Sequence, residues 1–259
     1  MSSVGVLDKV MAILDAFGDG TDRLEPPQVA ARIGISAPTA YRLMGAMAEH
    51  RLLGTEGRGF RLGSRLLQLG ARASDGVEVR GIALPLMKEL RDATGETVEL
   101  QVLVGHTRVP VEMVVGLRTV RTAGQIGVPL PTHLGASSRV LLAWLDESTA
   151  LALAARSAAD HPGTSWDPDT YRHLLRLVRA QGWEFSARER DPESSAVSVP
   201  IRDRHDDVIA ALVVSGTATR LADQAHRSVV IERARTAATV ISAELGCDAS
   251  SPTPQESIA

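Results

Sequence analysis

Apolar residues at helical spacing dominate the N-terminal part of the chain, and a first predicted helix carries them on one face at Val6, Val10, Ile13, Leu14 and Phe17. Gly18 and Gly20 then end this helix. A short second helix is predicted from Pro27, and Gly34 supplies the tight turn after it. Ser36 can cap a third helix. The inward face of the third helix is apolar at Ala40, Leu43, Met44 and Met47.

A glycine-rich turn follows the third helix. Gly57, Arg58 and Gly59 separate two short strand-like segments, 52–56 and 60–62, which predicts a β-hairpin with an arginine at its tip. Two helices, a turn, a third helix and a basic hairpin together predict a winged helix-turn-helix. A small helical packing unit without a ligand is the alternative interpretation.

The outer face of the third helix is small, hydroxylated and basic, which suits an element that enters a DNA major groove about 12 Å wide. Positive charge also concentrates here. Positions 32–72 hold seven arginines and two glutamates, a net charge of +5, in a chain whose total is −3. Such a patch favours duplex DNA through counterion release, although a solvated arginine-rich face has the same composition. The candidate DNA-binding residues are Ser36, Ala37, Pro38, Thr39, Tyr41, Arg42, Arg58 and Arg61.

The rest of the chain alternates helix and strand patterns. A helix is predicted over roughly 81–94 with Gly95 as its C-cap, followed by alternating apolar residues on both sides of a turn at 105–108. A second hairpin is predicted from 196–201 and 208–215. Helices are predicted at about 147–158, 168–181 and 222–245. The pattern predicts an α+β fold with a partly open antiparallel sheet, one face of which is available for a pocket.

Composition limits the function classes further. The chain has 259 residues, 44% hydrophobic and 23% charged, as expected for a globular protein. Charges at Asp8, Lys9 and Asp15 disfavour both a membrane helix and a secretory signal, so we predict a cytoplasmic protein without a membrane partner. The single cysteine, Cys247, excludes an internal disulfide and a cysteine-based zinc finger. An aromatic content of 3% disfavours single-strand binding by base stacking.

Motifs for catalysis are absent from the sequence, apart from His133 ahead of Ser137 and Ser138. A serine hydrolase would need His133 within hydrogen-bond reach of Ser137 and an acid to orient the ring, and this enzyme is the rival hypothesis. A ligand cradle is the other interpretation, because free backbone amides and hydroxyls at the start of an apolar helix attract carboxylates and phosphates. Simple capping of that helix by the two serines would give the same pattern.

Three segments in the N-terminal part resemble IclR-type transcriptional regulators. They are 6–14, then Ile-Gly-Ile-Ser-Ala-Pro-Thr-Ala-Tyr-Arg-Leu-Met at 33–44, and Phe-Arg-Leu-Gly-Ser-Arg-Leu-Leu-Gln-Leu-Gly at 60–70, which is similar to the wing exit and linker helix of the family. The resemblance covers nearly the whole chain apart from the last dozen residues. It implies a homodimer or a dimer of dimers that binds double-stranded operator DNA and responds to a small-molecule effector, with no cofactor.

The same resemblance implies an effector pocket in the C-terminal part. The candidate effector-binding residues are Leu130, His133, Ala136, Ser137, Ser138, Ser186, Ala196, Val213 and Ser215. Carboxylate-sensing members carry an acid, a cysteine and a serine where this chain has Ser186, Ala196 and Val213, so we predict a less polar pocket without zinc. Segments 135–138 and 186–192 resemble the NdgR-like subset, which regulates amino-acid biosynthesis genes. A ligand that joins a carboxylate to a hydrophobic body, such as a branched amino acid or its keto acid, fits both features.

The sequence therefore predicts a repressor in four parts. They are a winged helix-turn-helix domain at 1–66, a linker helix region at 67–80, an effector-binding and oligomerisation domain at 81–247 and a disordered tail at 248–259. We expect Thr39, Tyr41 and Arg42 in the groove, and Arg58 and Arg61 on phosphates or in the minor groove. Apolar residues beside the wing predict two-fold pairing: Leu66, Leu67 and Leu69. A ligand-binding module with a decayed DNA-binding segment and a constitutive DNA binder with a closed pocket are further hypotheses.

Overall fold

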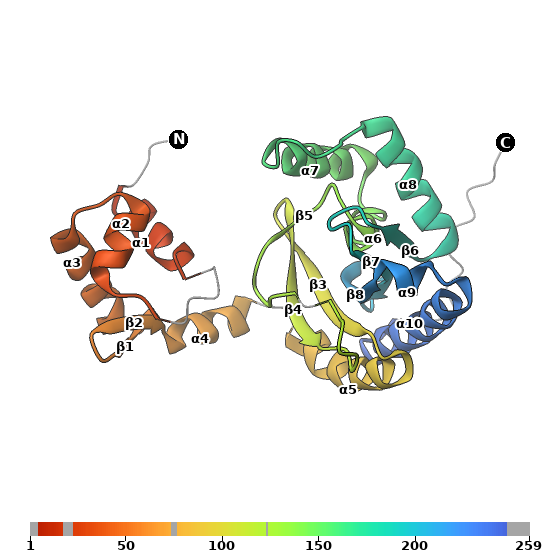
Figure 1. Cartoon of the computed structure of the whole chain (residues 1–259), viewed down its shortest axis with the longest axis horizontal. Helices are drawn as coiled ribbons and strands as arrows, with labels where there is room; N and C mark the ends of the chain where they lie inside the picture. Colours follow the sequence, from red (N-terminus) through yellow and green to blue (C-terminus); the bar gives the residue numbers. More distant parts are fainter. Residues whose placement is uncertain (1–4, 18–22, 74–76, 123, 248–259) are drawn as a thin grey trace. The chain divides into compact units, whose positions relative to one another are not determined.

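The computed structural model describes residues 5–17, 23–73, 77–122 and 124–247. The chain forms two compact units, Met1–Asp75 and Gly76–Ala259, with separate hydrophobic cores (Figure 1). Among these residues, no helix has the length and apolar character needed to cross a membrane. The predicted disordered tail at 248–259 and the predicted helix end at Gly18 and Gly20 lie outside the described residues.

The N-terminal unit has the predicted winged helix-turn-helix order. Its elements are α1 (Gly5–Asp15), α2 (Pro26–Ile33), α3 (Ala37–Glu49), β1 (Leu53–Glu56), β2 (Gly59–Leu62) and α4 (Ser64–Ala73). As predicted, Ser36 caps α3, and Gly34 ends α2 in the left-handed conformation with φ 70°. α2 begins at Pro26, one residue earlier than predicted, where Glu25 and Gln28 form a capping box.

The core of this unit joins α1, α2, α3 and the hairpin. Its buried residues are Ile13, Phe17, Leu24, Val29, Ala30, Ala40, Met44, Met47 and Leu53. α3 turns its predicted apolar face inward. Val6 departs from the prediction, since its side chain is 63% exposed at the start of α1 and takes no part in this core.

The hairpin of β1 and β2 forms the wing. Leu53 pairs with Leu62 and the strands run antiparallel, while an isolated bridge from Leu24 to Phe60 ties the wing to the segment before α2. Gly63 ends the wing where the chain passes close to the backbone of Arg51. A Cβ atom at Gly63 would overlap the Arg51 carbonyl oxygen, so this position requires glycine.

The C-terminal unit is the predicted mixture of helices and antiparallel strands. Its elements are α5 (Val77–Thr94), β3 (Thr97–Val104), β4 (Thr107–Val114), β5 (Leu130–Pro131), α6 (Ala136–Leu142), α7 (Glu147–Ala159), α8 (Pro168–Gln181), β6 (Glu184–Ala187), β7 (Ser194–Arg202), β8 (Val208–Thr217), α9 (Ala218–Ala222) and α10 (Gln224–Glu244). Both predicted hairpins are present, as β3–β4 and β7–β8. The predicted last helix at 222–245 corresponds to α10, which Asp223 caps, and α9, capped by Thr217, is a short helix before it that the sequence did not predict.

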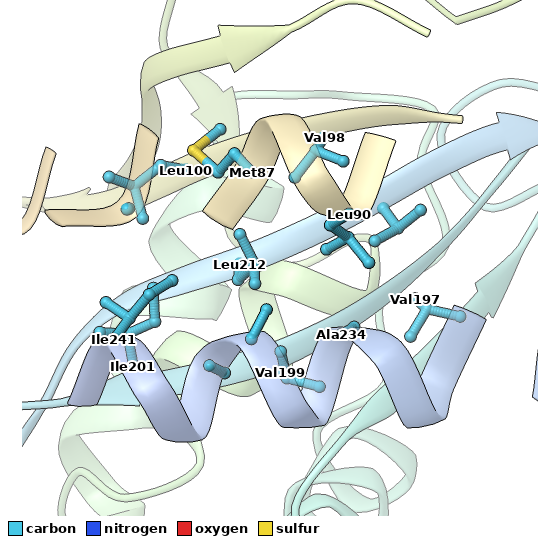
Figure 2. Packing of buried hydrophobic residues seen from close by; sticks show 14 of the residues in the cluster. Met87, Leu90, Val98, Leu100, Val197, Val199, Ile201, Leu212, Ala234 and Ile241 are labelled. Atoms are coloured by element: carbon cyan, nitrogen blue, oxygen red, sulfur yellow. The ribbon is translucent and has the colours of Figure 1, made fainter. Parts of the chain in front are cut away.

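Helices cover both faces of the C-terminal sheet. The strand order is β5-β4-β3-β8-β7-β6, with every neighbouring pair antiparallel. α5 and α10 pack on one face, where Figure 2 shows Met87 and Leu90 of α5 beside Leu100 and Leu212 of the strands. α6 packs on the opposite face and joins α7 and α8 in a second apolar cluster (Figure 1).

Because helices cover both faces of the sheet, successive residues of a central strand point alternately into the α5–α10 layer and into the α6 layer. Both of these layers are buried. In β3, Val98 and Leu100 join the α5–α10 layer, while Glu99 and Gln101 are buried on the α6 side. Arg108 also differs from the prediction. The sequence pattern predicts a turn at this position, whereas Arg108 lies in β4 opposite Leu103 and is only 4% exposed.

Candidate functional site

The outer face of α3 presents the side chains predicted to enter the groove. Pro38, Tyr41 and Arg42 are exposed at positions i, i+3 and i+4, opposite the buried face of the helix. Tyr41 is 56% exposed, which is unusual for an aromatic side chain without a partner. Ala37 differs from these residues, since it is half-buried and packs against the core.

The two hydroxyls at the start of α3 serve the helix itself. Ser36 Oγ accepts a hydrogen bond from the Thr39 backbone N–H and lies 2.8 Å from Thr39 Oγ1. A DNA contact by either hydroxyl must therefore use its remaining hydrogen-bonding capacity. Tyr41 and Arg42 carry no such commitment among the described residues, so they are the stronger candidates for base or phosphate contacts.

The wing carries two exposed arginines. Arg58 lies in the turn between β1 and β2, and Arg61 lies on β2. Arg61 Nε is 4.0 Å from Glu56 Oε2, and this exposed pair holds the guanidinium only weakly. Both cations are therefore available to phosphate groups.

The role of two other arginines could not be predicted from the sequence. Arg23 pairs with Glu25 at 3.0 Å and packs beside Gly59, where a Cβ atom would overlap its side chain, so it adds a cation at the wing. Arg32 belongs to the basic segment, but it donates a hydrogen bond to the Ala16 carbonyl oxygen at 2.9 Å. Its guanidinium therefore caps the carboxyl end of α1 in addition to adding positive charge to the surface.

A small polar cavity lies in the C-terminal unit beside the first turn of α6. It brings together six of the predicted effector residues, Ala136, Ser137, Ser186, Ala196, Val213 and Ser215. Sheet register explains part of this grouping, because Ala196 lies opposite both Ser186 and Ser215, and antiparallel partners share a face. The cavity is also lined by residues that the sequence did not indicate, Glu99, Gln101, Arg108, Thr122, Gly135, Glu189, Arg190, Ser194 and Ser195.

Three predicted effector residues are not brought to the cavity. Leu130 lies in β5 at the edge of the sheet. His133 is buried elsewhere, with its ring nitrogens 3.1 Å from Ser157 Oγ and 2.8 Å from Thr164 Oγ1. Ser138 donates its hydroxyl to backbone carbonyl oxygens of the preceding turn. All three have structural partners that come from residues far along the chain or from the turn itself.

The pair required by the hydrolase hypothesis does not form. Ser137 Oγ donates to Gln101 Oε1 at 2.9 Å and accepts from Arg108 Nη1 at 2.9 Å, so its partners are not His133. Burial lowers the pKa of His133, and the charges of His161 and Arg108 lower it further. The ring nitrogens face the hydroxyls of Ser157 and Thr164, so the predicted pairing of His133 with Ser137 is absent.

Arg108 is the buried cation of the cavity, which the exposed Arg190 also lines. Arg108 donates through Nη1 to Gln101 Oε1 at 2.6 Å and to Ser137 Oγ, and through Nε to the Pro131 carbonyl oxygen at 2.9 Å. All of these acceptors are neutral. Its Nη2 makes one long contact of 3.5 Å to a backbone carbonyl before α6. Burial, with the charge of Arg190, lowers the pKa of Arg108 to about 10, so the guanidinium stays protonated at neutral pH.

Glu99 supplies a negative charge in the same cavity. Its side chain accepts hydrogen bonds from Gln101 Nε2 at 2.6 Å and from Ser215 Oγ at 3.2 Å. Ser215 Oγ in turn lies 2.8 Å from Thr122 Oγ1. Within the described ranges, Glu99 forms no ion pair, and the residue is only 6% exposed.

Arg139 of α6 neutralises two further acids near the cavity. It forms a bidentate pair with Glu189 at 2.7 and 2.8 Å, and its Nε lies 3.3 Å from Glu184 Oε2. Burial alone would raise the pKa of Glu189, but Arg139 and the Gly135 backbone N–H hold it below its usual value. Burial raises the pKa of Glu184 against the opposing effect of Arg139.

The cavity is more polar than the sequence predicted, because β3 and β4 contribute Glu99, Gln101 and Arg108 to its lining. Its volume is about 50 Å³. Over the residues the structure describes, no group of three or more histidine, cysteine, aspartate or glutamate side chains could hold a metal ion. The sequence carries no specific signal for the missed residues, since polar positions such as Glu99 and Gln101 alternating with apolar ones are the ordinary pattern of an antiparallel strand with one open face.

Comparison with known proteins identifies the family. A model of the IclR helix-turn-helix domain matches residues 6–57, and a model of the bacterial transcriptional regulator IclR C-terminal domain matches residues 71–243. The chain belongs to the IclR family. It is a DNA-binding transcriptional regulator with an effector-binding C-terminal domain, and not an enzyme.

Individual relatives cover nearly the full length of this IclR-family chain. The HTH-type transcriptional regulator XynR of Escherichia coli (strain K12) is 28% identical, over 95% of this chain and 99% of its own. The glycerol operon regulatory protein of Streptomyces coelicolor is also 28% identical, over 93% and 96%. A crystal structure of an IclR homolog from Microbacterium hydrocarbonoxydans complexed with 4-hydroxybenzoate is 25% identical, with a TM-score of 0.79, over 93% of this chain and 99% of that one.

We predict that Arg139→Gln lowers the free energy of unfolding by about 3 kcal/mol at neutral pH, because the buried Glu184 and the partly exposed Glu189 lose their counter-ion. Since the pKa of Glu189 is lowered in the fold, its stabilising effect is complete above the ordinary glutamate pKa of 4.5 and is lost as the pH falls through the lowered value. The difference between wild type and variant should therefore shrink below about pH 4.5. Urea unfolding at a series of pH values measures this difference.

Arg172→Gln is the matched control for that experiment. Arg172 pairs with Glu147 at 2.7 Å on the surface of α8, so its loss should have a much smaller effect on stability. A deficit in Arg139→Gln that is equal at pH 7 and pH 3 would contradict the assigned role of Glu189.

Proposed function

We propose that this regulator is a cytoplasmic homodimeric repressor that releases its operator when a small carboxylate occupies the cavity of the C-terminal unit. The observation that carries the effector class is Arg108, a buried cation whose hydrogen-bond acceptors are all neutral. A buried cation of this kind gains most from a ligand that brings a negative charge. The 4-hydroxybenzoate bound by the Microbacterium homolog is also a carboxylate, which supports the same class.

The proposed DNA contacts are made by α3 and the wing. Tyr41 and Arg42 project from the exposed face of α3, in keeping with a recognition helix in the major groove. Arg58 and Arg61 on the wing, together with Arg23 beside it, are placed to neutralise phosphates. Phosphate contacts orient the domain, while contacts from α3 distinguish sequences.

The relatives do not support the more specific assignment to the NdgR-like subset. The proposal about the effector therefore rests on the chemistry of the cavity. Ser137 and Arg108 bind the carboxylate, while Ala196 and Val213 supply apolar contacts to its carbon skeleton. The cavity is small, with a volume of about 50 Å³, which favours a small ligand.

Exposed apolar residues support pairing of the N-terminal units. Val6, Leu7 and Met11 on α1 are 63%, 57% and 49% exposed, and Leu69 on α4 is 45% exposed. Leu7 and Met11 lie four residues apart on one helix and so form a contiguous exposed apolar face, which is typical of an interaction surface. Two-fold pairing would bury them and would give the operator two half-sites.

We predict that Arg42→Ala weakens binding to the gene's own upstream region by about 1–3 kcal/mol without unfolding the domain. A base contact would relax specificity at one position, and a phosphate contact would weaken all sequences equally and reduce the salt dependence by about one ion. Gel shifts over a salt series measure both effects. Arg176→Ala on α8 is the control, and unchanged affinity of Arg42→Ala would refute the assignment of α3.

Replacing Arg108 by Gln should weaken the binding of monocarboxylates by at least about tenfold, since a hydrogen bond to a charged group is lost. L-valine, pyruvate and 4-hydroxybenzoate are the probes, and calorimetry and operator release are the readouts. Arg176→Gln is the control for the loss of one positive charge. A response that persists in Arg108→Gln would place the effector elsewhere, and a wild-type protein without any response would favour constitutive DNA binding.

The full-length protein should sediment as a dimer or a dimer of dimers at micromolar concentration. Leu69→Lys should shift this equilibrium toward the monomer, because a charge replaces a side chain that the pairing would bury. Leu177→Lys on α8, where the native side chain is 44% exposed, is the matched control. A stable wild-type monomer would contradict the proposed assembly.

A further inference from the structure

Two opposite charges in the effector cavity lack direct ionic partners. Arg108 donates to an amide oxygen, a hydroxyl and a backbone carbonyl, and Glu99 accepts from an amide and a hydroxyl. Neither belongs to an ion pair within the described residues, although 4% and 6% exposure remove both from most of the solvent. Arg139 is the contrasting case in the same unit, because its charge is neutralised by the Glu189 carboxylate in a bidentate pair at 2.7 and 2.8 Å.

The Gln101 side chain bridges the two charges. Its Oε1 accepts from Arg108 at 2.6 Å, and its Nε2 donates to Glu99 at 2.6 Å. One amide group thus presents an acceptor to the cation and a donor to the anion. Arg108 and Glu99 are therefore separated by the length of one amide group, so a short ligand with a negative end and a positive end can contact both.

We propose that the cavity selects an α-amino acid, with its carboxylate on Arg108 and Ser137 and its ammonium on Glu99. This inference rests on the proposed carboxylate effector and narrows it to a zwitterion. Both ionic groups of an α-amino acid are attached to one carbon, so they fit alongside the Gln101 amide with the same polarity. Ser215, which donates to Glu99 at 3.2 Å, fixes the carboxylate that receives the ammonium.

Electrostatics and size both favour this ligand. A zwitterion supplies a counter-charge to each buried ion and leaves the net charge of the cavity unchanged. An oxo acid or a simple fatty acid provides a counter-charge only to Arg108. Its uncharged carbon would lie beside the buried carboxylate of Glu99, which lowers the affinity for such ligands. The volume of about 50 Å³ favours amino acids with small side chains.

Matched ligands test the selection on the unmodified protein. L-alanine, pyruvate and propionate share three carbons and differ at the second, as do L-valine, 3-methyl-2-oxobutanoate and 3-methylbutanoate among five-carbon chains. In calorimetry with full-length protein, the amino acid of at least one series should bind at least about tenfold more tightly than its two analogues. Equal or tighter binding of the oxo acid in both series, or no binding by any of the twenty protein amino acids, would overturn the proposal.

Variants then test the residue assigned to the ammonium. Glu99→Gln keeps the shape and should reduce the preference for the amino acid to about one, while binding of the oxo acid is retained or improved. Glu112→Gln is the control, because Glu112 lies on the neighbouring strand, pairs with Arg80 at 2.6 Å and does not line the cavity. A preference that survives in Glu99→Gln would refute this role. If Glu99→Gln fails to fold, the wild-type ratios still decide the ligand class.

The same assays separate this inference from the broader proposal. Operator release by pyruvate or 4-hydroxybenzoate, but by no amino acid, would overturn the zwitterion and leave carboxylate sensing intact. Absence of any response to all of these compounds would overturn both.

Discussion

The C-terminal unit depends on a sheet that is covered by helices on both faces. α5 and α10 take one set of alternating side chains, such as Val98, Leu100 and Leu212, and α6 with its neighbours covers the other. Polar side chains on the second set cannot turn to solvent, so they must bond to one another. The network of Glu99, Gln101, Arg108 and Ser137 is the result of that constraint.

Buried charge is handled in two ways on this face of the sheet. Arg139 is neutralised by Glu189 and Glu184, and that cluster ties α6 to β6 and to the segment that follows it. Arg108 is held by neutral oxygens instead, which orient the guanidinium without cancelling its charge. A fixed and uncancelled charge is poorly suited to stabilising a core and well suited to binding an ion of opposite sign.

Local signals explain why the N-terminal unit could be predicted almost completely. Ser36 as a cap, Gly34 as a left-handed turn and the glycines of the wing act within a few residues of their position. The cavity depends on distant pairs, such as Ser215 with Glu99 across 116 positions and Ser137 with Arg108 across 29. Spacing within one segment cannot reveal such contacts. The sequence predicts His133 in the site from its position near Ser137, whereas its hydrogen-bond partners, Ser157 and Thr164, lie 24 and 31 residues further along the chain.

DNA binding and effector binding belong to two units with separate cores, so the affinity measured for one ligand depends on whether the other is bound. If effector and operator bind with opposite preference for two states of the protein, each weakens the other by the same factor, so an absolute affinity depends on the presence of DNA. The free energy of changing state is common to all ligands that bind the same state, and it cancels from the ratio of two affinities. The ratio between an amino acid and its oxo acid therefore reports the difference at the second carbon, where Glu99 lies, because the carboxylate on Arg108 is common to both ligands. The affinity of either ligand by itself also reports the coupling to DNA.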